Sequence, residues 1–206
     1  MAACVSCGKE VGREALCSCG SVQAMPGGLT YFDALGVPVT FALEASDLDK
    51  RFRALSLKLH PDRFARRDPA QRKSALAWTT ALNDAYRALK DPLRRAEYFL
   101  AQHGLRPLGE GAKAGDGQRL GLEFLEEAME DREQLAEAKA NGAAEVEALR
   151  QKVVAKVEAA TRAIADGLGA FERSGDRASL EVAADKLSRL RYHQRFLEEV
   201  EGRVHE

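Results

Sequence analysis

The apolar periodicity of residues 46–60 constrains the fold of this chain more than any other feature. Four side chains recur every three or four residues and form one stripe: Leu48, Phe52, Leu55 and Leu59. This spacing is typical of a helix with one buried face. Ser46 and Asp49 stand three residues apart, which predicts a capping box at its start. Pro61 ends the helix, because its ring disfavours the α conformation for His60.

Further helix signals extend from residue 29 to residue 104. Residues 29–35 predict a short helix. Asp68-Pro69 and Asp91-Pro92 each combine an N-cap residue with proline at the first helical position, which predicts one long and one shorter helix. Because a loop of about eight residues joins the two long helices, we expect them to be antiparallel. His60-Pro61-Asp62 would then stand at the exposed tip of this hairpin.

The second half of the chain predicts a helical bundle. Residues 105–118 are rich in glycine and predict a linker. Amphipathic patterns follow near 119–140, 143–173 and 177–204, separated by short turns, which predicts an antiparallel three-helix bundle within residues 119–206. Only 6% of the residues are aromatic, β-branched residues are sparse and no strand pattern is evident. We therefore predict an all-α fold.

All four cysteines lie in the first nineteen residues, at Cys4, Cys7, Cys17 and Cys19. Clustered thiolates that follow this pattern are typical of a tetrahedral zinc site, and we predict structural zinc in a cysteine-rich segment over residues 1–25. The second pair is one residue shorter than the usual Cys-x-x-Cys. Bound iron, or a metal-free, redox-sensitive tail, are the alternatives. No organic cofactor is expected.

Charge is distributed unevenly along the chain. Residues 1–104 contain 15 Lys and Arg against 11 Asp and Glu, whereas residues 105–206 contain 16 against 21. Two surfaces of opposite charge suggest that the protein binds two different partners. No apolar run is long enough to span a membrane, and the N-terminus "MAACVSCGKE" resembles neither a signal peptide nor a transit peptide. We therefore expect a cytoplasmic protein that does not bind membranes.

Residues 29–104 resemble a J-domain, a helical hairpin with His-Pro-Asp in its connecting loop. The tripeptide lies between a basic amphipathic helix and a second helix that ends in "NDAYRALKDPLRRAEY". The resemblance implies a co-chaperone that docks on a DnaK-type chaperone and stimulates its ATPase. No nucleophile and base are arranged for catalysis here, so we expect that the protein is not an enzyme.

A chaperone-binding surface follows from the same residues. Helical geometry places Lys50, Arg53 and Leu57 away from the buried stripe. The positive charges suit an acidic partner, Leu57 supplies an apolar anchor, and Asp62 is able to accept hydrogen bonds from a partner arginine. The predicted surface consists of Lys50, Arg53, Leu57, Lys58, His60, Pro61, Asp62 and Arg63.

The C-terminal half resembles HscB, the J-protein family of iron–sulfur cluster assembly. The segments "LEFLEEAMEDREQLAEA", "AADKLSRLRYHQRFLEE" and "RRAEYFLAQHG" carry this resemblance. It implies two partners, an HscA- or DnaK-type chaperone and an IscU-like scaffold. It places the scaffold-binding site on Leu125, Met129, Glu130, Glu133, Glu137 and Tyr192, with Glu126 where the familiar bacterial member has an apolar residue.

Helical geometry supports a client surface on the first bundle helix. Phe124 and Leu135 belong to one stripe, whereas Leu125 and Met129 belong to a second, about 120° around the axis. Packing needs one stripe, so the second is free for a partner, or it packs against the J-domain or a neighbouring helix. On the third bundle helix, Tyr192 and Phe196 are predicted to face away from the main leucine stripe.

Two other functions are weighed against the iron–sulfur co-chaperone. A general protein-folding J-protein is the first, although the long Gly/Phe-rich stretch and repeated cysteine pairs of such proteins are missing. A zinc-containing nucleic-acid binder is the second. We expect no nucleic-acid binding, because the chain is slightly acidic overall and no basic and aromatic residues alternate around the cysteines.

Overall fold

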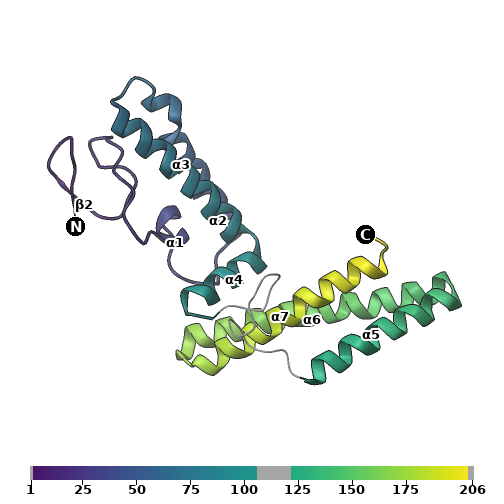
Figure 1. The fold of residues 1–206 in the computed structure, drawn as a ribbon. Coiled ribbons are helices and arrows are strands. Elements are labelled where there is room, and N and C mark those ends of the chain that lie inside the picture. The colour runs from purple at the N-terminus through teal and green to yellow at the C-terminus, as the bar shows by residue number, and fades with distance from the viewer. Residues whose placement is uncertain (1, 106–121, 204–206) are drawn as a thin grey trace. The chain divides into compact units, whose positions relative to one another are not determined.

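The computed structural model describes residues 2–105 and 122–203, which form two compact units (Figure 1). The first unit contains Met1–Arg95 and the second Ala96–Glu206. The linker predicted over 105–118 lies outside the described residues, apart from Leu105. None of the described helices is both long and apolar enough to cross a membrane.

The cysteine-rich segment forms two short hairpins, which the sequence did not predict. Strand β1 (Ala2–Ala3) pairs antiparallel with β2 (Glu10–Val11), and Leu16 and Val22 form an isolated bridge. Strands of two residues are too short to show alternation between polar and apolar side chains, so no sequence pattern predicts them. The segment belongs to the same compact unit as the helices that follow it.

Two helices begin the predicted hairpin domain. Helix α1 (Tyr31–Leu35) starts at Thr30, which forms a capping box with Asp33, and ends at Gly36 with φ of 62°. Helix α2 (Ala45–Leu59) begins after Glu44 and has no side-chain cap. The capping box predicted at Ser46 is therefore wrong, because Ser46 already lies inside the first turn, beyond the N-cap position.

The two long helices of the hairpin are antiparallel, as predicted (Figure 1). Helix α3 (Pro69–Lys90) starts at Asp68, whose carboxylate accepts the backbone N–H of Gln71 at 2.9 Å. The end of α2 lies beside the middle of α3, since the Thr79 hydroxyl donates to the Leu59 carbonyl at 3.2 Å. Of the predicted stripe of α2, Leu48 and Leu59 are buried, whereas Phe52 and Leu55 are half-buried. The core of this unit also contains Phe32, Leu35, Trp78, Leu82 and Leu89.

Helix α4 (Pro92–Gln102) contains residues of both units. In the first unit, the Arg95 guanidinium donates to the Leu43 carbonyl at 2.9 Å. In the second unit, the ring of Phe99 lies 6.2 Å from that of Phe171, and Arg191 forms an ion pair with Glu97.

The second unit contains the predicted three-helix bundle, drawn in green and yellow in Figure 1. Its helices are α5 (Leu122–Asn141), α6 (Ala143–Ser174) and α7 (Arg177–Val200). One buried cluster joins all three and contains Leu135, Ala138, Leu149, Val153, Phe196 and Val200. A buried carboxylate, Asp131, accepts from Lys156 at 2.9 Å, and Glu127 shares the same ammonium at 2.8 Å.

Candidate functional site

The four cysteines converge, as the sequence predicted. Their sulfur atoms all lie within 4.8 Å of one another. The Cys4 and Cys19 sulfurs are 3.7 Å apart, and those of Cys7 and Cys17 are 3.6 Å apart. A tetrahedral Zn²⁺ with bonds of about 2.3 Å requires sulfur separations of about 3.8 Å. All four cysteines are free, so the cluster is compatible with a structural metal site.

Backbone hydrogen bonds shape each cysteine pair into a turn. The Gly8 N–H donates to the Cys4 carbonyl at 2.8 Å, and the Gly20 N–H donates to the Cys17 carbonyl at 2.9 Å. Both glycines have positive φ, 70° and 85°, which a residue with a Cβ rarely adopts. The shorter second pair therefore closes a tighter turn, and all four sulfurs still converge.

The thiols of the metal-free cluster differ in acidity. The backbone N–H of Ser6 lowers the pKa of Cys4 to about 6, against the opposing effect of desolvation. A backbone hydrogen bond from Cys19 lowers the pKa of Cys17. A hydrogen bond from Lys9 favours the Cys7 thiolate, but desolvation and the neighbouring thiols outweigh it and raise the pKa of Cys7 to about 11. A metal ion that binds all four sulfurs must therefore displace protons.

A buried glutamine connects the cysteine cluster to the helical core. The Gln23 side-chain amide donates to the Cys4 sulfur at 3.4 Å, and its backbone carbonyl accepts from the Trp78 indole at 2.8 Å. The Gln71 amide also donates to the Ser21 hydroxyl at 3.3 Å. Sequence reasoning missed Gln23, since a lone polar residue four positions after the last cysteine follows no spacing rule. These contacts hold the cysteine segment against α3.

The His-Pro-Asp tripeptide forms a solvent-exposed turn at the end of α2. Pro61 opens a 3₁₀ helix, η1 (Pro61–Phe64), and the Asp62 backbone N–H donates to His60 Nδ1 at 3.3 Å. The Asp62 carboxylate oxygen Oδ2 lies 3.5 Å from the same nitrogen, and its side chain is 89% exposed. Phe64 is buried and anchors the far end of the turn. Asp62 is therefore presented to solvent on a fixed backbone.

The predicted chaperone-binding residues of α2 lie on the outer surface. Leu57 is 72% exposed, an unusual position for a leucine within a helix that buries Leu48 and Leu59. Lys50, Arg53 and Lys58 are also exposed, and the Lys50 ammonium is 3.2 Å from Asp47. Because Leu57 and these charges share the surface that continues to the turn, an acidic partner with an apolar contact point fits it.

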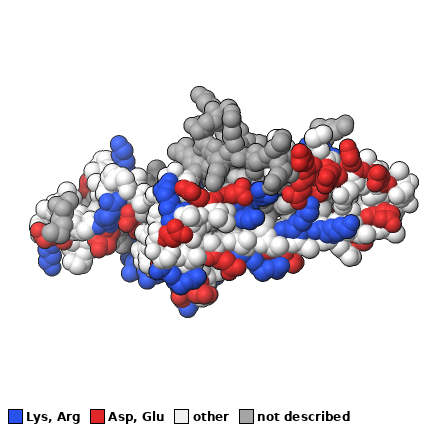
Figure 2. Space-filling model, turned by 90° about the horizontal axis from the view of Figure 1, so that it is seen from below, with Lys and Arg blue, Asp and Glu red and all other residues white. Residues whose placement is uncertain are grey.

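Helix α5 exposes an apolar pair beside a row of carboxylates. Leu125 is 52% exposed and Met129 is 67% exposed, whereas Phe124 and Leu135 of the other stripe are buried. The row consists of Glu126, Glu130, Glu133 and Glu137, and all four are exposed. Figure 2 shows acidic side chains, with basic ones among them, on the right-hand part of the visible face. The second predicted stripe therefore faces solvent at both of these residues.

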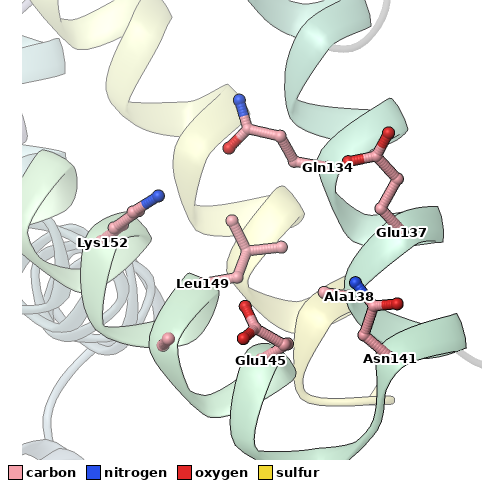
Figure 3. A pocket seen from close by; sticks show the side chains of 8 residues that line it. Gln134, Glu137, Ala138, Asn141, Glu145, Leu149 and Lys152 are labelled. Carbon is pink, nitrogen blue, oxygen red and sulfur yellow. The ribbon is translucent and has the colours of Figure 1, made fainter.

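Glu137 also lies at the edge of a small cavity between α5 and α6 (Figure 3). The cavity measures about 260 Å³, and its lining residues are Gln134, Glu137, Ala138, Asn141, Glu145, Ala148, Leu149 and Lys152. Leu149 forms an apolar wall, and the polar side chains come from both helices. The acidic row of α5 thus continues to the turn between these helices.

Phe196 does not face outward, which corrects the sequence prediction, and Tyr192 is only partly exposed. Phe196 is buried in the bundle core, and the Tyr192 ring lies 5.2 Å from the ring of Phe124. The Tyr192 hydroxyl donates to the Ala128 carbonyl at 3.0 Å. Burial, followed by the charge of Asp131, raises the pKa of Tyr192 to about 12 and keeps this hydroxyl protonated. Tyr192 therefore fastens α7 to α5 at Ala128, the residue before Met129, because this part of α7 packs against α5 through more than one stripe.

Comparisons with known proteins match both units. Residues 30–98 match the DnaJ domain, and residues 121–201 match the HSCB C-terminal oligomerisation domain. The co-chaperone protein HscB homolog of Burkholderia multivorans is 35% identical over 175 residues, which are 85% of this chain and 94% of that protein. The homolog of Paraburkholderia xenovorans is 35% identical over 171 residues, 83% of this chain and 91% of that protein.

Solved structures agree with these matches. The chaperone HscB from Vibrio cholerae superposes with a TM-score of 0.63 at 33% identity, covering 84% of this chain and 96% of that one. The crystal structure of human co-chaperone protein HscB superposes with a TM-score of 0.74 at 28% identity, covering 97% of each chain. The chain, with its His-Pro-Asp turn and helical bundle, therefore belongs to the HscB family of J-domain co-chaperones.

Proposed function

We propose that this co-chaperone serves iron–sulfur cluster biogenesis by binding an IscU-like scaffold and stimulating the ATPase of an HscA- or DnaK-type chaperone. The observation that carries the proposal is the presence of two differently charged surfaces on two units of one HscB-family chain. One surface is the basic α2 face with its His-Pro-Asp turn, and the other is the acidic, apolar face of α5. A chain that holds both partners raises the concentration of scaffold near the chaperone.

The chaperone-binding surface consists of Lys50, Arg53, Leu57, Lys58, His60, Pro61, Asp62 and Arg63. The cations steer an acidic chaperone surface toward α2, and Leu57 is buried on contact. Asp62 accepts charge-assisted hydrogen bonds from the chaperone, and its fixed backbone keeps the entropic cost of ordering low. ATP hydrolysis takes place in the chaperone, and this protein acts by binding.

The scaffold-binding surface consists of Leu125, Glu126, Met129, Glu130, Glu133 and Glu137, with Tyr192 behind it. Burial of Leu125 and Met129 supplies the apolar contact, and the carboxylates form a polar rim that selects a basic partner. Tyr192 contributes mainly by holding α5 in place, because its hydroxyl is bound to the Ala128 carbonyl. Its partly exposed ring is available at the edge of the contact.

Zinc is the metal that best suits the cysteine cluster. Four thiolates in a closed tetrahedral set are the usual ligands of structural Zn²⁺, which would cross-link the two hairpins when bound. Cys4, Cys7, Cys17 and Cys19 would hold it, and Gln23 would orient the Cys4 sulfur by its 3.4 Å contact. The cytoplasmic location expected from the sequence stays a prediction.

Steady-state ATPase assays of a DnaK-type chaperone, with and without an IscU-like scaffold, test the proposal. We expect this protein and the scaffold together to stimulate hydrolysis more than the sum of their separate effects. His60→Gln should abolish stimulation without unfolding the protein, and normal stimulation by that variant would refute the docking assignment. Stimulation that is indifferent to the scaffold would instead favour general protein folding.

A further inference from the structure

An open groove lies inside the first unit, between the second cysteine hairpin and the turn that follows α2. Its volume is about 480 Å³. The hairpin contributes Leu16, Cys17, Ser18 and Gly20, and the helical side contributes Lys58, Arg63, Phe64 and Arg67. Phe64 is buried and provides apolar surface, while Ser18 is exposed at the hairpin wall.

The groove is positively charged. Three cationic side chains, Lys58, Arg63 and Arg67, line it, and no carboxylate does. All three are exposed, and none forms an ion pair with a carboxylate among the described residues. Neighbouring cations without counter-charges attract an anionic group and repel one another, so an acidic occupant lowers the energy of the site.

The hairpin wall is fastened to the helical part of the unit by hydrogen bonds to α3. The Trp78 indole donates to the Gln23 carbonyl at 2.8 Å, and the Gln71 amide donates to the Ser21 hydroxyl at 3.3 Å. Both donors belong to α3, which begins only a few residues after Arg67. The groove is thus already formed before any partner binds, which reduces the entropic cost of binding.

We propose that the chaperone-docking surface continues from the His-Pro-Asp turn into this groove, which takes an acidic, extended segment of the chaperone. The inference rests on the proposed function, because Lys58 and Arg63 belong to both the α2 surface and the groove. It assigns the cysteine hairpin a role beyond folding, as the second wall of the binding site. Arg67, outside the residues predicted from the sequence, becomes a specificity-determining contact.

Binding of Arg67→Glu to the ATP-bound DnaK-type chaperone tests the charge of the groove. We expect the dissociation constant to rise about tenfold at low ionic strength, since reversal replaces an attraction by a repulsion. The difference should shrink at high salt. The maximal ATPase stimulation should remain, with a higher half-stimulating concentration. Arg66→Glu is the matched control, because Arg66 is adjacent and exposed but does not line the groove. Equal losses in both variants would overturn the proposal.

Ser18→Glu tests the hairpin wall, because it places a carboxylate opposite the cations. We expect a similar loss of affinity, whereas Val5→Glu, between the first two cysteines and 85% exposed, should bind like the wild type. All variants should contain the same amount of bound metal as the wild type. If Arg67→Glu is depleted of metal, the cations serve the cysteine cluster instead, and the proposal is overturned. If His60→Gln removes binding but Arg67→Glu and Ser18→Glu do not weaken it, the groove fails and the proposed function stands. If the wild type does not bind the chaperone, the proposed function itself fails.

Discussion

Removal of the exposed apolar pair of α5 should separate scaffold binding from chaperone stimulation. In the double variant Leu125→Ala and Met129→Ala, both side chains lose the area that a partner would cover. Complete burial of such a side chain contributes about 1.5–3 kcal/mol. Since Leu125 is 52% exposed and Met129 67% exposed, about half to two-thirds of that contribution is still available for binding.

The expected loss follows from these fractions. The two side chains together offer about 2–3.5 kcal/mol, which corresponds to about 30- to 300-fold in the dissociation constant. Because each alanine retains its Cβ, we expect a value near the lower end, about 30-fold. The free energy of unfolding should change little, since neither side chain belongs to the buried cluster of the bundle.

Isothermal titration calorimetry with an IscU-like scaffold measures this loss directly. Val182→Ala is the matched control, because Val182 is 53% exposed on α7 of the same bundle and belongs to neither proposed surface. Stimulation of the chaperone ATPase in the absence of scaffold should be unchanged in the double variant. A dissociation constant within twofold of that of Val182→Ala would refute the assignment of the scaffold to this face of α5.

Three further predictions concern stability and metal binding. Lys156→Met leaves the buried Asp131 carboxylate without its cation and should lower the free energy of unfolding by about 2 kcal/mol. The loss is smaller than for a fully buried pair because Lys156 is partly exposed. Urea denaturation measures this change, and Lys139→Met, at an exposed position, should leave the free energy of unfolding unchanged. Burial, with a smaller effect of Lys156, lowers the pKa of His193, so the folded bundle holds this imidazole neutral. The contribution of His193 to stability is complete above the pKa of about 6.5 that this group has in the unfolded chain, and it is lost as the pH falls below that value. The unfolding midpoint should therefore drop between about pH 7 and pH 5, and this drop should be smaller in His193→Gln. Zinc binding at pH 7 should release at least the Cys7 proton, because the pKa of Cys7 is about 11; calorimetry in buffers of different ionisation enthalpy counts the protons, and no buffer dependence would contradict thiolate ligation.

The helices, the hairpin and the bundle were predictable from local patterns. Apolar spacing located the buried stripe of α2, and Asp68-Pro69 marked the start of α3 where the structure has it. The four cysteines were identified as one cluster, since few chemistries other than metal binding or oxidation gather thiols in a short segment. Each of these signals depends on residues that are close together in the chain, and the sequence displays them directly.

Other features depend on contacts between distant residues, which no local pattern encodes. Tyr192 was predicted to face outward, yet its hydroxyl reaches the Ala128 carbonyl across 64 positions, because a bundle of three helices draws on more than one stripe of α7. Gln23 reaches Trp78 across 55 positions, and this contact helps to hold the cysteine hairpin beside the groove that ends near the His-Pro-Asp turn. The sequence by itself determined the helices, the turn and the cysteine cluster, since these follow from local backbone preferences and side-chain chemistry. Only the tertiary structure decided which side chains remain exposed for partners, because exposure is set by packing between segments far apart in the chain.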